Sequence, residues 1–196
     1  MTEDSTESVE RLIAARQTVL PKRLIEPGPS DEQINRLFLA ASAAPDHGQL
    51  TPWRFLIIPK HKREALGRLF AEALLERDAA ATAEQVAAAR DKAFRSPFLM
   101  LVSVDEGQAP HEVDVHERVL SAGCAIQNIL LLATAMGYGS SLTSGKALKS
   151  KSLRDGLGLR ETEHAICFVN IGTIGLARPS NGRSAIQDFA KTWSGT

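Results

Sequence analysis

Hydrophobic residues recur at helical spacing over several stretches of this chain. In residues 30–41 the apolar side chains stand three or four positions apart, at Ile34, Leu37, Phe38 and Ala41. Ser30 precedes this stripe with Gln33 three positions later, which is the spacing of a capping box at a helix N-terminus. The same spacing rules predict helices near residues 8–16, 65–74, 82–94 and 151–157.

Short, continuous apolar runs mark a second kind of element. They cover residues 53–58, 98–104 and 165–171. The first two are typical of strands that are buried on both faces, and the third predicts a further strong strand. A shorter strand is expected at 140–142, after Gly137-Tyr138-Gly139 ends a helix. Because helices and strands do not alternate in strict βαβ order, the pattern predicts an α+β fold with a sheet covered by helices.

One stretch reaches the length of a membrane span, because residues 119–136 contain no charge. Polar residues interrupt it at Gln127, Asn128 and Thr134. We therefore expect a long buried central helix of a globular core, and no membrane partner. Its small residues at 121–125 would let another backbone approach closely, within the subunit or across a dimer.

Size and charge narrow the class further. With 196 residues and 43% apolar content, the chain fits one domain over 1–196, with 1–9 and 180–196 as extended tails. Lys plus Arg and Asp plus Glu are balanced at 23 each, so no nucleic-acid partner is expected. The polar, acidic first ten residues lack an apolar leader, which predicts a cytoplasmic location.

A few apolar residues carry expectations of their own. Cys124 and Cys167 stand alone in apolar runs and are expected to be small buried hydrophobic residues. In the polar C-terminal stretch, Ile186 and Phe189 are the residues expected to anchor the tail.

The loop at residues 44–53 contains two prolines, a glycine and four hydrogen-bonding side chains between a predicted helix and a predicted strand. Each proline fixes its own φ and biases the preceding residue toward extended backbone, so the loop is rigid at both ends. A rigid loop with Asp46, His47 and Gln49 is a suitable place to hold a small planar ligand. The alternative is a plain turn that uses Asp46 and Gly48 for their backbone preferences.

Three other motifs contain side chains that could carry chemistry. Arg16-Gln17-Thr18 could grip a phosphate and the edge of a heterocycle, or could be a solvated basic helix end favoured by the macrodipole. The segment at 137–145 nearly matches G-x-G-x-x-G, but it follows a helix and carries Leu142 at the last glycine position, so a Rossmann site fails on context. His111 and His116 are five apart, which favours a solvated helix start over a zinc site.

The 44–53 loop resembles the Pro-Ser-x-Gly-Asn-x-Gln-Pro-Trp loop of the nitroreductase family, flavoenzymes that bind FMN. Four of its residues match that motif: Pro45, Gly48, Pro52 and Trp53. The pair Asp46-His47 is similar to the smallest members, and further matches extend the resemblance over about residues 10–178. It implies a nitroreductase-like fold with a mostly antiparallel central sheet covered by helices, and a homodimer whose flavin sites are built from both subunits.

The resemblance also implies a set of flavin contacts. These are Arg16, Gln17, Thr18, His47, Gln49, Leu142, Thr143, Ser144 and Arg178. Family members carry an Arg-Arg-Ser-like motif at the first three positions, an asparagine at Gln49 that contacts the flavin ring, and a late basic residue at Arg178 that neutralises the phosphate. His47 would reach the flavin across the dimer interface.

Several of these positions depart from the family pattern. Gln17 replaces an arginine, Thr18 a serine and Thr51 a glutamine, while Leu142-Thr143 stand where minimal members often have Trp-Arg. The resemblance nevertheless implies an FMN-dependent oxidoreductase that takes a hydride from NADH or NADPH. It would reduce nitroaromatics, quinones or activated alkenes in a ping-pong cycle, with no catalytic side chain and no metal assigned. The alternative is a non-catalytic protein that stores or senses flavin.

Overall fold

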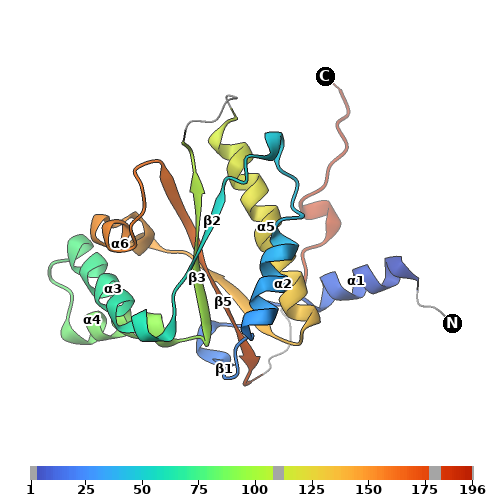
Figure 1. The fold of residues 1–196 in the computed structure, drawn as a ribbon. Helices are drawn as coiled ribbons and strands as arrows, with labels where there is room; N and C mark the ends of the chain where they lie inside the picture. Colours follow the sequence, from blue (N-terminus) through green and yellow to red (C-terminus); the bar gives the residue numbers. More distant parts are fainter. Residues whose placement is uncertain (1–3, 108–112, 177–181, 196) are drawn as a thin grey trace.

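The computed structural model describes residues 4–107, 113–176 and 182–195, which form a five-stranded sheet with helices on both faces (Figure 1). The helices are α1 Ser5–Ala15, α2 Asp31–Ala41, α3 Arg63–Arg77, α4 Ala83–Arg90, α5 Val115–Ala135 and α6 Lys151–Gly156. The strands are β1 Leu24–Ile25, β2 Trp53–Ile57, β3 Phe98–Asp105, β4 Gly139–Thr143 and β5 Glu163–Ile174. Because α1 begins at Ser5, the described part of the first nine residues is mostly helical.

β5 is the centre of the sheet. The strand order in the sheet is β1-β5-β3-β2, and β4 also pairs with β5. Every one of these strand pairs is antiparallel. Val169 shows the arrangement, because it lies opposite Met100 of β3 on one side and Leu142 of β4 on the other. The predicted mostly antiparallel sheet is confirmed.

Two separate cores form because side chains alternate between the faces of each strand. Met100 and Val102 point toward α2 and α5, while Leu99 and Leu101 point toward α3 and α6. Figure 1 shows α3, α4 and α6 on one side of the sheet and α2 and α5 on the other. β3 is buried on both faces as predicted, since helices cover both.

The long helix α5 confirms the predicted central helix. It is long and apolar enough to cross a membrane by length and composition, but eight of its residues are buried inside this structure. It packs against α2 and the sheet. One stripe of α5 stays open to solvent, at Leu120, Gly123 and Gln127, which are three or four positions apart.

Three expectations about burial are wrong. In the sheet formed by the described residues, β2 is an edge strand paired with β3 alone, so Leu56 and Ile57 are each 39% exposed instead of buried. Ile186 and Phe189 do not anchor the C-terminal segment within this chain, because both remain more than 70% exposed. Cys167 is buried as expected, but Cys124 is only half-buried, since it stands at the margin of the open stripe of α5.

Candidate functional site

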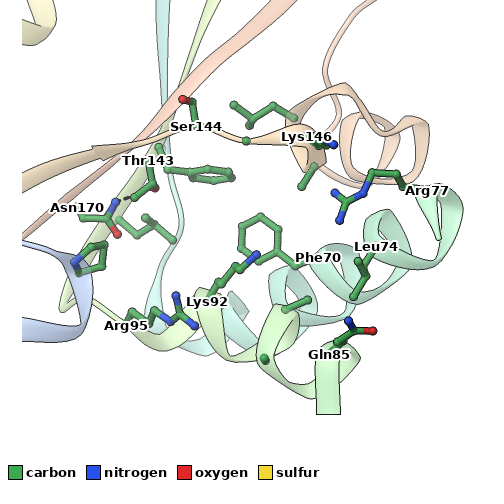
Figure 2. Close-up of a pocket in the computed structure, with 18 of the residues that line it drawn as sticks. Phe70, Leu74, Arg77, Gln85, Lys92, Arg95, Thr143, Ser144, Lys146 and Asn170 are labelled. Carbon is green, nitrogen blue, oxygen red and sulfur yellow. Dashed lines mark hydrogen bonds between the residues drawn. The ribbon is translucent and has the colours of Figure 1, made fainter. Parts of the chain in front are cut away.

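A cavity of about 530 Å³ opens between the α3–α4 pair and the end of β4 (Figure 2). This volume lies within the range of about 300–1,000 Å³ typical of small-molecule sites. Its apolar wall consists of aromatic and aliphatic side chains from helix α3 and from the sheet: Phe70, Leu74, Leu99 and Phe168. Such a wall suits a planar aromatic ligand.

β4 carries two of the predicted flavin contacts into this cavity. Thr143 lies opposite Phe168 on β5, and both line the cavity together with Ser144. Leu142 does not line it, because neighbouring residues of a strand point to opposite faces. Leu142 is instead 45% exposed beyond the other face of the strand.

Asn170 organises the polar end of the cavity. This buried residue of β5 donates from Nδ2 to Thr143 Oγ1 at 3.1 Å and to the carbonyl of Ser141 at 3.4 Å, and its Oδ1 accepts from Ser96 Oγ at 2.9 Å. Figure 2 shows Asn170 and Thr143 side by side, joined by this hydrogen bond. Because the Thr143 oxygen accepts from Asn170, its single hydroxyl proton is free to donate to a ligand.

A second hydroxyl near this end has no partner. Ser141 Oγ is the buried side-chain atom that lacks a hydrogen bond in the described part of the chain. Ser141 lies directly opposite Asn170 and two residues before Thr143, so the three share one face of the sheet. A buried hydroxyl without a hydrogen bond costs stability, so its presence here calls for an explanation beyond packing. A polar ligand group bound beside Ser141 would supply the missing partner.

Four cations line the same cavity: Arg77, Lys92, Arg95 and Lys146. Among the described residues, none of the four has a carboxylate within ion-pair distance. The acidic residue in the described lining is Asp78, whose carboxylate accepts the backbone N–H of Ala80 at 3.1 Å. The cavity is therefore apolar in its wall and positive at its margin.

The Arg16-Gln17-Thr18 motif lies at the other end of β4. Arg16 caps the end of α1, Thr18 forms a parallel bridge with Ser140, and Val19 donates its backbone N–H to the Ser140 carbonyl at 2.9 Å. Thr143 lies three positions after Ser140 along the strand, a rise of about 10 Å. The fold therefore brings the two predicted groups to the same edge of the sheet.

His47 and Gln49 lie elsewhere in the chain. His47 Nδ1 stands 2.7 Å from Glu117 Oε2 at the start of α5, and both side chains are more than half exposed. Their loop precedes β2, which β3 and β5 separate from β4 by about 14 Å of sheet width. Within one chain, the structure does not bring these residues to the cavity.

The 44–53 loop is held in an unusual backbone conformation. Gln49 and Thr51 have φ values of +54° and +45°, in the left-handed region that disfavours residues with a Cβ. Asp46 holds this shape, because its carboxylate accepts the backbone N–H of Thr51 at 2.6 Å. Strained loops of this kind occur at ligand-binding segments, so the strain favours a functional loop over a plain turn.

Arg178 and His111 lie outside the described residues. In the described C-terminal segment, Arg183 donates from Nη2 to the carbonyls of Arg16 at 3.0 Å and Ala14 at 3.3 Å, which places a cation at the end of α1. Within the described ranges, no group of three or more His, Cys, Asp or Glu residues could hold a metal ion.

The cavity also contains residues that the sequence analysis missed. Arg77, Lys92, Arg95 and Lys146 looked like ordinary surface cations, because nothing in their spacing shows that they face one cavity. Asn170 did leave a signal, since a single amide in an otherwise apolar buried strand requires hydrogen-bond partners.

Comparison with known proteins decides the family, because the Nitroreductase family pattern matches residues 14–173. The chain belongs to the nitroreductase family. The predicted family and the predicted class of oxidoreductase are thereby confirmed. A curated relative from Haemophilus influenzae, named "Putative NAD(P)H nitroreductase", is 36% identical over 152 residues, covering 78% of this chain and 82% of the relative.

Solved structures confirm the nitroreductase-like fold. A nitroreductase-like family protein from Bacillus cereus superposes with a TM-score of 0.83 at 21% identity, covering 100% of both chains. The FMN and NADPH-dependent nitroreductase NfnB from Sphigopyxis sp. strain HMH superposes with a TM-score of 0.72 at 16% identity, covering 95% of this chain and 99% of NfnB. At these identities the likeness concerns the fold.

Proposed function

We propose that this nitroreductase-family protein is an FMN-dependent NAD(P)H oxidoreductase that reduces nitroaromatics, quinones or activated alkenes in a ping-pong cycle. The observation that carries the proposal is the cavity at the end of β4, with an aromatic wall, the Thr143–Asn170 hydrogen bond and a positive margin. This donor set fits FMN, which combines a planar ring with a phosphate. Bound FMN would supply the two-electron chemistry by accepting a hydride from the nicotinamide and passing it to the oxidant.

Each group of residues has a distinct task in this proposal. Phe70 and Phe168 would pack against the ring system and exclude water, while the Thr143 hydroxyl would donate to a ring acceptor. Arg95 would bind the phosphate together with the Arg16–Thr18 segment. A cytoplasmic location remains a prediction.

The proposal is tested by the anaerobic absorption spectrum of the FMN-loaded protein, before and after addition of NADPH or NADH. We expect flavin bands that bleach on addition of a donor and return when a quinone is added. Bands that persist with both donors would favour the alternative, a flavin-binding protein without turnover. A protein that takes up no FMN would contradict both.

We also propose that the active form is a homodimer in which His47 and Gln49 of one subunit complete the cavity of the other. Two features support this. No residue of α1 is buried, although its eleven residues carry exposed Val9 and Ile13, and so short a helix is marginal in water without a partner. Figure 1 shows α1 projecting from the body of the chain.

Gly123 supports the same interface. It lies in the open stripe of α5, where a Cβ would meet nothing within 4 Å, so no contact within the described part of the chain requires a glycine there. Glycine in a helix costs about 1 kcal/mol relative to alanine, and such a cost is offset when another backbone must approach closely. The exposed Leu39 on α2 and Leu120 on α5 add apolar surface to this side of the molecule.

Gly123→Leu is therefore expected to weaken the dimer. Overpacking a close contact costs about 1–3 kcal/mol, which corresponds to a rise of about 5- to 150-fold in the dissociation constant. Sedimentation equilibrium would measure this rise, with Ala87→Leu on the exposed face of α4 as the control. A protein that stays equally dimeric with Leu at 123 would place the interface elsewhere.

A further inference from the structure

The cavity carries more positive charge than one cofactor phosphate requires. A phosphate monoester bears about −1.5 to −2 charges at pH 7, whereas four cations line this cavity without a carboxylate partner among the described residues. Four cations against the one carboxylate of the described lining, Asp78, leave an excess of three positive charges. Because like charges around a cavity repel one another, this excess indicates additional anionic ligand groups.

The cations lie at separate ends of the cavity. In Figure 2, Arg95 lies toward the end with Asn170 and Thr143, while Arg77 and Lys146 lie at the opposite side. Arg77 is the last residue of α3, and Lys146 begins the short turn that follows Ser144 and Gly145. The macrodipole of α3 accounts for a cation at Arg77, but it does not account for Lys146 on a different element.

The nature of the second anion follows from the proposed function, on which this inference rests. Nitroaromatics, quinones and activated alkenes need carry no phosphate. Of the proposed substrates, the nicotinamide electron donor is therefore the one that contains further phosphate groups. NADH and NADPH share a pyrophosphate, and NADPH adds a terminal 2′-phosphate on its adenosine half, remote from the nicotinamide. The solvent-exposed Arg77 and Lys146 stand at the end of the cavity remote from Thr143.

We propose that Arg77 and Lys146 bind the 2′-phosphate of NADPH and thereby make NADPH the preferred donor over NADH. Arg77 offers planar donors that match phosphate oxygens, and Lys146 adds a compact charge. Gln85, which lines the same part of the cavity, supplies an amide that can donate to a third oxygen.

The test measures binding to the FMN-loaded protein without turnover. Isothermal titration would compare adenosine 2′,5′-bisphosphate with AMP, which differ only in the 2′-phosphate. We expect the bisphosphate to bind at least about tenfold tighter, and Arg77→Gln or Lys146→Gln to remove about tenfold of that difference while AMP affinity is unchanged. Lys149→Gln is the matched control, since Lys149 is exposed in the same turn but does not line the cavity.

The contrary outcomes are distinct. A protein that takes up FMN yet binds both nucleotides equally overturns this inference and leaves the proposed function standing. A parallel loss of AMP and bisphosphate affinity in both variants also overturns it, because the cations would then contact the shared phosphate. A protein that takes up no FMN overturns the proposed function itself.

Discussion

Replacing Arg63 with Met is expected to lower the free energy of unfolding by about 3–5 kcal/mol. Arg63 begins α3 and is 4% exposed, yet among the described residues no carboxylate lies within ion-pair distance of its guanidinium. Its guanidinium donates to the carbonyls of Ile58 and Ala93 at 2.8 Å, and more weakly to those of Ser96 and Pro97 at 3.4 and 3.3 Å.

Through these hydrogen bonds, the Arg63 side chain connects the end of β2 to the segment that precedes β3. Burial lowers the pKa of Arg63 to about 10, which still leaves the guanidinium protonated at pH 7. Hydrogen bonds from a charged donor contribute about 1.5–3 kcal/mol each, and Met would leave several buried carbonyls without that donor. The expected loss therefore exceeds that of an ordinary surface change.

Urea unfolding of the FMN-loaded protein would measure the change, read from the midpoint at constant slope. Arg68→Met is the control, because Arg68 lies five residues further along α3, is exposed and has only a 4.0 Å contact with Glu64. Its effect should stay within about 0.5 kcal/mol. A loss below 1 kcal/mol at Arg63 would show that the four carbonyls are satisfied without it.

Replacing Arg95 with Ala is expected to raise the dissociation constant of FMN about 10- to 100-fold, the equivalent of one hydrogen bond to a charged group. Arg95 lies at the end of the cavity with Asn170 and Thr143. Arg95 lies between Ala93 and Ser96, whose carbonyls accept hydrogen bonds from Arg63. A phosphate bound there would lose its planar donor.

The dissociation constant would be measured by quenching of flavin fluorescence as the apoprotein is added. Arg95→Lys should keep part of the affinity, because it keeps the charge and loses the planar geometry. Arg90→Ala serves as the control, since Arg90 pairs with Glu64 and does not line the cavity. An Arg95→Ala affinity within twofold of the native protein would move the FMN phosphate to another part of the chain.

The helices and strands could be predicted closely because local chemistry specifies them. Ser30 and Gln33 form the capping box of α2, and Thr82 and Gln85 form that of α4, as their spacing indicates. Gly137, with a φ of +84°, follows the end of α5 in the left-handed conformation that glycine readily adopts. The burial of β2 was mispredicted, because an apolar run does not reveal whether a strand lies at the edge or in the centre of a sheet.

The candidate site was predicted in part. Thr143 and Ser144 line the cavity, and Arg16–Thr18 lies at the other end of the same strand, but His47 and Gln49 stand on the far side of the sheet. These assignments remain proposals about flavin contact. For His47 this distance agrees with the family resemblance, which implies contact with the flavin across the dimer interface, whereas nothing in the sequence assigned Gln49 to a second copy of the chain.

By itself, the sequence determined the elements, the α+β class and the family, because caps, periodicity and motifs are local properties of neighbouring residues. The tertiary structure alone decided that Arg77, Lys92, Arg95 and Lys146 face one cavity, and that buried Asn170 orients Thr143. These groups come from α3, from the short turn Asp91–Phe94 and the residue after it, from β4 and the turn that follows it, and from β5. Arg77 and Asn170, at positions 77 and 170, are therefore far apart along the chain. Only the pairing of strands and the packing of helices on the sheet bring such distant residues together, and that geometry is not encoded in any short stretch of sequence.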